Sequence, residues 1–194
     1  MSMAVTIETV LSQENLLKAM EAFEGKRDSC GVDGVKLSAL EEYWEANGEK
    51  IKKTILQGEY NLGYVKQQEI MNAKGKKRTI SLMNTIDRFI YRALMQGLAK
   101  EWTPLFSEYS YAYQDHKGIR QAVEQAAEYM ENGYVWCVEL DIQNFFDNIN
   151  HDSLLRKIKK IVSDERVIDL VIAYMNCTVI DDHLYYRREK GVLQ

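Results

Sequence analysis

Apolar residues recur three and four positions apart near the start of the chain, which is the spacing of one helix face. This pattern predicts a helix over residues 13–25, which Ser12 can cap, and a second over residues 38–57, which Gly58 ends. Further helices are expected over residues 84–102, 118–132, 151–161 and 164–175. The first two helices are expected to form part of the scaffold.

A change to alternating side chains marks the expected β-structure. The change begins at residue 60, residues 64–71 alternate, residues 78–82 resemble a returning strand, and Gly75 lies in the lysine-rich connection of this β-hairpin. Residues 134–141 are rich in β-formers and too short and apolar for an exposed helix, so they predict a strand. A last hairpin is expected to turn residues 177–180 back into residues 184–187. Helices and strands together predict an α+β fold.

Composition narrows the class of protein. The 194 residues are 46% hydrophobic and include one proline, which fits a globular core in one domain or two small, closely joined ones. The three cysteines form no Cys-x-x-Cys pair, which favours a reducing environment over zinc or disulfide chemistry. The start of the chain lacks a signal-peptide pattern, and its most apolar run is too short to span a bilayer. A cytoplasmic protein without a membrane partner is therefore expected.

The net charge of −4 hides an uneven distribution along the chain. Residues 66–120 carry 10 basic and 5 acidic side chains, whereas the segments on either side are acidic. Binding of a phosphate backbone depends on the charges in contact with it and not on the total charge. The acidic average therefore does not exclude a nucleic-acid partner.

Asp141 is the most distinctive candidate for chemistry. A carboxylate at the end of a buried strand, followed at once by a turn, places a hard oxygen ligand where Mg²⁺ and phosphate can meet. The Ile142 carbonyl can be a second ligand, and the free N–H groups of Asn144 and Phe145 can contact a triphosphate. The simpler alternative is that Asp141 only caps the turn, and it stays open on these residues alone.

A wider pattern, Asp-Ile-x-x-Phe-Phe-Asp-x-Ile-x-His, runs from residue 141 to residue 151. It resembles the first catalytic motif of reverse transcriptases, most closely the maturases encoded by group II introns. The resemblance implies that Asp141 binds both catalytic metal ions and that Phe146 packs under the sugar as a gate against ribonucleotides. Of Phe145 and Phe146, one is expected to be buried and one to face the site. His151 is expected to order the turn after Asn150.

The resemblance extends through most of the chain in the family's order. Residues 31–34 resemble its Gly-x-Asp-Gly motif, residues 74–78 its basic fingers hairpin, residues 87–88 an Asp-Arg pair, residues 110–113 a Ser-Tyr-Gly-Phe motif, and residues 191–194 the start of Gly-x-x-Gln-Gly. One departure concerns residues 70–72, Ile-Met-Asn, where many members have Ile-Pro-Lys. One triphosphate contact is therefore absent or supplied by Lys74.

Residue roles follow from these matches. The nucleotide-binding candidates are Lys66, Arg78, Asn144, Phe145, Phe146 and Gln194, and the RNA-binding candidates are Lys74, Lys76, Lys77 and Arg88. An arginine can hold phosphate oxygens in a fixed fork, whereas lysines act as flexible point charges. Taken without the motif that begins at Asp141, the basic hairpin would be no more than a solvated turn.

The implied architecture is a right-hand polymerase, with fingers of helices plus a basic β-hairpin in residues 1–120 and the first part of an antiparallel-sheet palm in residues 121–194. The implied reaction adds a dNTP to a DNA primer on an RNA template with two Mg²⁺ ions. The family's Tyr-x-Asp-Asp hairpin does not occur in the sequence. The chain is therefore expected to be truncated before it and inactive alone. Intron RNA is a further expected partner, and the oligomeric state is not indicated.

Two alternatives belong to other classes. The first is a non-catalytic RNA-binding module, in which the basic hairpin grips intron RNA. The second is a diguanylate-cyclase-like palm, which also has a magnesium-binding Asp at a strand end. The second alternative explains neither the basic residues 74–78 nor residues 191–194, and its Gly-Gly-Asp/Glu-Glu-Phe signature does not occur.

Overall fold

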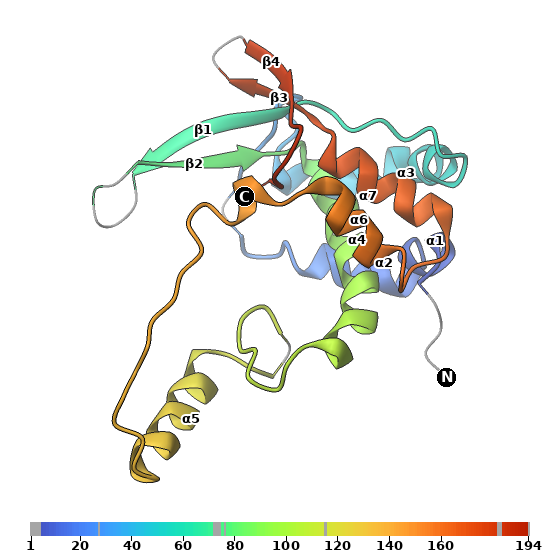
Figure 1. The fold of residues 1–194 in the computed structure, drawn as a ribbon. Helices are drawn as coiled ribbons and strands as arrows, with labels where there is room; N and C mark the ends of the chain where they lie inside the picture. The colour runs from blue at the N-terminus through green and yellow to red at the C-terminus, as the bar shows by residue number, and fades with distance from the viewer. Residues whose placement is uncertain are drawn as a thin grey trace.

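The computed structural model describes residues 5–26, 28–71, 75, 77–114, 116–181 and 184–193, and it confirms the α+β class (Figure 1). The helices are α1 (Ile7–Val10), α2 (Gln13–Glu21), α3 (Leu40–Leu56), α4 (Thr85–Trp102), α5 (Ile119–Glu131), α6 (His151–Ile158) and α7 (Glu165–Met175), with 3₁₀ turns at Leu37–Ala39, Thr103–Leu105 and Phe146–Asn148. The strands are β1 (Val65–Met71), β2 (Lys77–Leu82), β3 (Thr178–Asp181) and β4 (Leu184–Arg187). The six helices expected from the sequence are confirmed, several with shorter ends.

Side-chain caps fix where four of these helices begin, and in α1 the Thr6 side chain accepts from the Thr9 N–H at 3.2 Å. The side chains of Ser12, Asn150 and Asp164 each accept a hydrogen bond from a backbone N–H in the first turn of α2, α6 and α7. Such a bond satisfies one of the N–H groups that lack a partner within the helix. None of the helices in the described part of the chain is long and apolar enough to cross a membrane.

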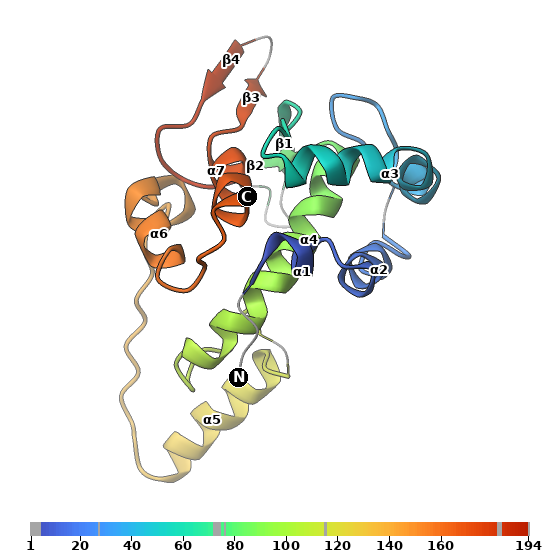
Figure 2. The ribbon, with the colours of Figure 1, turned by 90° about the vertical axis from the view of Figure 1, so that its right-hand side faces the viewer.

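The core is built around α4. Helices α1, α2 and α3 pack against it, and α7 packs against α3 and α6 (Figures 1 and 2). Phe89 and Ile90 of α4 are fully buried. The rings of Phe89 and of Trp44 in α3 lie edge to face, with their centroids 4.8 Å apart. Buried residues from α1 to α4 and from α6 and α7 form one hydrophobic cluster. The two ends of the chain therefore share a core.

A buried carboxylate joins this core to the sheet. Asp87 of α4 is 2% exposed, and it accepts hydrogen bonds from the Tyr60 hydroxyl at 2.6 Å and the Gly63 N–H at 3.0 Å. The Tyr174 hydroxyl of α7 donates to the backbone carbonyl of Asp87 at 2.7 Å. Burial raises the pKa of Asp87, and the hydrogen bonds from Tyr60 and Gly63 act in the opposite direction. One residue therefore positions both the segment before β1 and the helix before β3.

The four strands form one sheet in the order β2-β1-β3-β4. Strand β1 is antiparallel to β2 and parallel to β3, and β3 is antiparallel to β4. Both hairpins expected from the sequence are confirmed, and Gly75 in the first connection has the expected positive φ of 73°. The parallel pairing of Val65 with Val179 joins the two hairpins and was not predicted. Strands from both sides of residue 120 share this sheet. The proposed division of the chain into two domains at residue 120 stays a prediction.

The predicted strand at residues 134–141 is wrong. In the structure these residues have no regular secondary structure, and Trp136 and Leu140 are 92% and 90% exposed. A strand is defined by ladder hydrogen bonds to a neighbour, and among the described residues no backbone hydrogen bond reaches residues 135–142. The segment runs from the end of α5, which projects away from the core, back to α6 (Figure 1). Its β-forming side chains therefore have no partner strand in the described chain.

Asp164 offers a test of how the N-terminal segment is held. Its carboxylate accepts from the Ile7 N–H at 2.8 Å, from the Arg166 N–H and from the Arg166 guanidinium. Partial burial raises the pKa of Asp164, but the bonds from Arg166 and Ile7 outweigh this effect and hold that pKa below its usual value. The stabilisation is therefore present above the unfolded-state pKa and is lost as the pH falls below about 4.

We expect Asp164→Ala to lower the free energy of unfolding by about 2–3 kcal/mol at pH 7, because a helix cap and a tether to Ile7 are both lost. Urea denaturation at several pH values should show this difference shrinking in acid. Asp169→Ala, at an exposed position of the same helix, is the control and should change stability by less than about 0.5 kcal/mol. A pH-independent difference would contradict the assigned role.

Candidate functional site

The structure places Asp141 and Ile142 in the exposed segment between α5 and α6. Because this segment is not a strand, the expected position of Asp141 at the lip of a sheet is not found. Within the described residues, no group of three or more His, Cys, Asp or Glu side chains could hold a metal ion. The donor set present here therefore does not by itself fit a pair of magnesium ions, which needs several carboxylate ligands.

The loop after Asp141 is tightly turned. Asn144 has a positive φ of 51°, and its carbonyl accepts from the Asn148 side chain at 3.0 Å. The rings of Phe145 and Phe146 lie edge to face, with their centroids 5.4 Å apart. They are 49% and 41% exposed, so the expectation that one of them is buried is wrong. Both aromatic surfaces are open to a ligand.

The segment after β4 is clasped to this loop. The Gly191 N–H donates to the Ile149 carbonyl at 2.8 Å, and the Val192 N–H donates to the Phe146 carbonyl at 2.9 Å. The His151 Nε2 atom lies 2.6 Å from the Gly191 carbonyl, which can only accept, so Nε2 carries the proton. The structure therefore brings two of the sequence motifs together, those beginning at residues 141 and 191.

Gly191 is required at this contact for steric reasons. Its φ is 80°, and a Cβ atom there would lie 2.8 Å from the Asp147 carbonyl oxygen and 2.9 Å from the Asp147 Cα. Both are backbone atoms that cannot rotate away. The motif glycine thus permits close approach of two backbone segments.

The basic hairpin carries its candidates at separate positions. Lys66 is exposed and is paired with Leu82, whereas Arg78 is paired with Ile70, four residue pairs further along β1 and β2. At about 3.3 Å per residue, their backbones are roughly 13 Å apart. Lys77 forms an exposed ion pair with Glu69 at 2.7 Å. Lys66 and Arg78 are therefore not neighbours in the sheet, and their backbone positions do not bring them to one small ligand group.

Arg88 is engaged inside the protein. Its Nη1 atom donates to the Ser29 hydroxyl at 2.7 Å, and its guanidinium lies over the Phe23 ring at 5.6 Å. These contacts favour a scaffold role over the expected RNA contact, which stays a prediction. The remaining candidates, Lys74, Lys76 and Gln194, lie outside the described residues.

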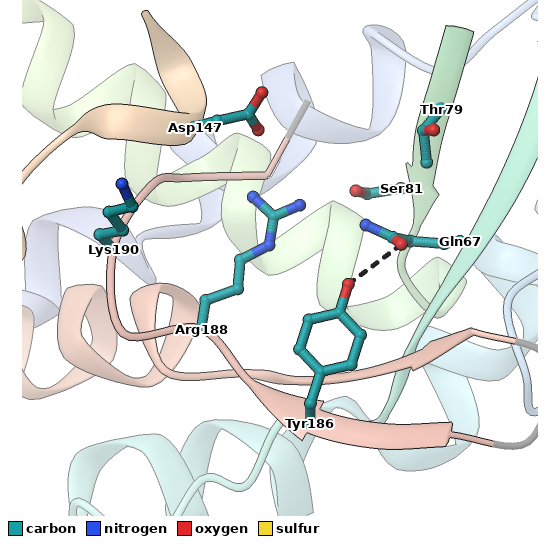
Figure 3. Close-up of a pocket in the computed structure, with 7 residues that line it drawn as sticks. All are labelled: Gln67, Thr79, Ser81, Asp147, Tyr186, Arg188 and Lys190. Atoms are coloured by element: carbon teal, nitrogen blue, oxygen red, sulfur yellow. Dashed lines mark hydrogen bonds between the residues drawn. The ribbon is translucent and has the colours of Figure 1, made fainter. Parts of the chain in front are cut away.

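A polar pocket of about 470 Å³ lies between the sheet and the clasped loop (Figure 3). Its lining comes from β1, β2, β4, the segment after β4, and the 3₁₀ turn, and consists of Gln67, Thr79, Ser81, Asp147, Tyr186, Arg188 and Lys190. None of these residues was predicted as a site residue. The alternation of each strand predicts which side chains share a face, but only the order of the strands shows which faces meet.

Internal hydrogen bonds hold four of the lining side chains. The Tyr186 hydroxyl donates to Gln67 Oε1 at 3.0 Å, as Figure 3 shows. Arg188 Nη1 donates to the Val192 carbonyl at 2.8 Å, and Lys190 Nζ donates to the Asn148 side chain at 2.9 Å. Two cations and the Asp147 carboxylate give the lining a formal charge of +1. The pocket is therefore preorganised and mildly cationic.

Comparison with known proteins gives a family match. The model of the family described as reverse transcriptase (RNA-dependent DNA polymerase) matches residues 65–193. The match includes both hairpins, the loop after Asp141 and the whole lining of the pocket.

Relatives and solved structures agree with this match. Protein YkfC of Escherichia coli (strain K12) is 24% identical over 168 residues, which are 84% of this chain and 44% of YkfC. Group II intron-encoded protein LtrA of Lactococcus lactis subsp. cremoris is 26% identical over 166 residues, 85% of this chain and 28% of LtrA. A chain of the "Partial Cas6-RT-Cas1--Cas2 complex" shares the fold, with a TM-score of 0.63 and 15% identity over 100% of this chain and 32% of that one. The chain thus spans less than half the length of these proteins.

The clasp at Gly191 can be tested by adding one carbon atom. We expect Gly191→Ala to lower the free energy of unfolding by about 2–3 kcal/mol, because the new Cβ meets the Asp147 backbone and the positive φ adds strain. Gly133→Ala is the matched control, because Gly133 also has a positive φ but nothing lies within 4 Å of its Cβ position. The control should cost only about 1 kcal/mol. Equal losses in urea denaturation would show that no steric clasp exists.

Proposed function

Since the chain belongs to the reverse transcriptase (RNA-dependent DNA polymerase) family, we propose that the full-length protein synthesises DNA on an RNA template. The observation that carries the proposal is the meeting of motifs from distant parts of the chain. The loop after Asp141 is hydrogen-bonded to the segment at Gly191. Both border the pocket, whose sheet side is formed by Gln67, Thr79 and Ser81 of the basic hairpin. Template RNA, a DNA primer and dNTPs are the partners in this proposal.

The nucleotide contacts are proposed for Lys66, Arg78, Asn144, Phe145, Phe146 and Gln194. The exposed rings of Phe145 and Phe146 support this assignment, because an aromatic surface near the sugar needs to be accessible. Lys66 is exposed on β1, on the face of the sheet opposite Gln67, and it is proposed to contact a phosphate from there as a flexible point charge. Arg78 would supply the fixed fork that lysine lacks.

Asp141 is proposed as one ligand of the catalytic magnesium ions, with the Ile142 carbonyl as a second. Magnesium supplies charge neutralisation and alignment of the reacting oxygens in phosphoryl transfer. Since the described residues do not complete such a site, we propose that other ligands come from the rest of the full-length protein. The exposure of Asp141 is consistent with a carboxylate that binds a metal ion together with ligands from other segments.

A second function, binding of intron RNA as a maturase, is compatible with the first. The relatives include LtrA, which is named a group II intron-encoded protein. The basic segment from residue 66 to residue 120 and the cationic pocket lining favour a nucleic-acid contact. Lys74, Lys76 and Lys77 are proposed to contact RNA. The family match removes the diguanylate-cyclase-like palm from the alternatives.

Primer extension by the full-length protein tests the role of Asp141. We expect Asp141→Ala to lower the extension rate to below about one hundredth of the wild-type rate, because a metal ligand is lost. RNA binding should remain nearly unchanged. Glu139→Ala is the control, because Glu139 is an exposed carboxylate two residues earlier in the same segment. Retained synthesis by Asp141→Ala would refute the metal-ligand role.

The isolated chain of residues 1–194 should bind RNA without extending a primer. The paired change Lys74→Gln and Lys76→Gln should lower the slope of log affinity against log salt by about 1.4, since a single strand contributes roughly 0.7 per phosphate contact. Lys50→Gln with Lys53→Gln, on exposed positions of α3, is the charge-matched control and should leave the slope unchanged. Measurable extension by the isolated chain, or equal slopes for both pairs, would contradict these assignments.

A further inference from the structure

The two faces of the sheet carry different chemistry. Because side chains alternate along a strand, the register that pairs Gln67 with Ser81 and Val179 with Tyr186 places the polar pocket residues on one face. The neighbouring residues Tyr185 and Arg187 lie on the opposite face, with Tyr185 paired with Ile180. Tyr186 on β4 and Arg188 directly after it therefore each have a chemically similar neighbour that cannot line the pocket.

Hydroxyl and amide groups dominate the sheet side of the pocket. Thr79, Ser81 and Tyr186 supply hydroxyls, which both donate and accept hydrogen bonds. Because the Tyr186 proton is directed to Gln67 Oε1, the Gln67 amide N–H groups and the Tyr186 lone pairs remain for a ligand. The pocket side of the sheet thus matches a ligand group that can donate and accept at once.

The opposite side of the pocket is charged. Arg188 is held by a bond to the Val192 carbonyl of its own segment, Lys190 is held by a bond to Asn148 of the clasped loop, and Asp147 lies beside them (Figure 3). An anchored arginine is well suited to a phosphate, because less side-chain freedom is lost on binding. The excess of one positive charge matches one phosphodiester.

The size and lining together indicate the ligand. A volume of about 470 Å³ lies in the range of small-molecule sites. A ribose 2′-hydroxyl both donates and accepts hydrogen bonds, and deoxyribose lacks this group. Tyr186 is the one aromatic residue in the described lining, and its hydroxyl is already bonded, so the lining has no pair of rings between which a base could be stacked. The lining therefore fits a sugar and its phosphate better than a base.

We propose that this pocket holds one ribose-phosphate unit of single-stranded RNA and selects RNA over DNA. Thr79, Ser81, Gln67 and Tyr186 contact the ribose hydroxyl, and Arg188 contacts the phosphate, with Lys190 beside it. The inference rests on the proposed function, because it assigns the choice of template to named residues. It concerns binding alone and involves no chemical step.

Fluorescence anisotropy with the purified chain tests the proposal. The probes are a labelled 12-nucleotide single-stranded RNA and the DNA of the same sequence. The variants Tyr186→Phe and Thr79→Val with Ser81→Ala should each reduce the RNA-over-DNA affinity ratio, by roughly two- to tenfold for each hydrogen bond lost. Tyr185→Phe, which removes the hydroxyl on the other face, should leave this ratio unchanged. Circular dichroism would confirm that each variant is folded.

The charged side has its own matched pair. Arg188→Gln should weaken binding of RNA and DNA alike and lower the salt slope by about 0.7, the contribution of one phosphate contact on a single strand. Arg187→Gln, on the opposite face, should do neither. Equal effects of the two arginine variants would show that the long-range electrostatic field of the protein, and not a direct contact from Arg188, acts on the nucleic acid.

Three results would overturn the proposal: loss of affinity for RNA and DNA in equal proportion in the hydroxyl variants, no loss for either, or a loss of the RNA preference in Tyr185→Phe. The proposed polymerase function is tested separately by primer extension with the full-length protein. Absence of extension with a retained, pocket-dependent RNA preference would reject the polymerase function alone. Extension with an RNA preference that ignores the pocket would reject this inference alone.

Discussion

The buried carboxylate of Asp87 is the constraint on which the rest of the structure depends. Burial of a charged group is costly unless hydrogen bonds satisfy it, and here Tyr60 and Gly63 supply them from the segment that leads into β1. The Tyr174 hydroxyl bonds the carbonyl of the same residue from α7, which leads into β3. Because both segments must meet α4 at one point, β1 and β3 leave the core side by side. Their parallel pairing follows from that position.

The pocket inherits its shape from this arrangement. Pairing of β1 with β3 puts the two hairpins in one sheet, so that β4 brings Arg188 and Lys190 to the face that carries Gln67. The chain after β4 is then fixed by the bonds of Gly191 to the loop around Ile149. A local change at Gly191 would therefore move both the loop and the cationic wall of the pocket.

The parts of the fold that sequence could predict are those with a local cause. Helices follow from apolar spacing and caps such as Ser12 and Asp164, and each hairpin follows from two alternating segments joined by a turn. The parallel contact of Val65 with Val179 has no local signature, because more than a hundred residues separate the two positions. The pocket was missed for the same reason, since its walls come from segments that meet only in the folded chain. The motifs did predict which segments matter, because the loop after Asp141 and Gly191 lie together.

The Asp141 segment separates what a motif predicts from what it cannot. A motif of residue types fixes the available chemistry, and a carboxylate with neighbouring aromatic rings remains available here. The direction of a side chain in an extended segment is set by the register with a partner strand, and a shift of one residue turns every side chain to the other face. In the described chain the bonds to the segment at Gly191 reach back only to Phe146, and residues 135–142 have no ladder partner. The position of Asp141 relative to a phosphate therefore depends on whatever fixes the register of this segment in the full-length protein, whereas the pocket beside Asp147 is already formed.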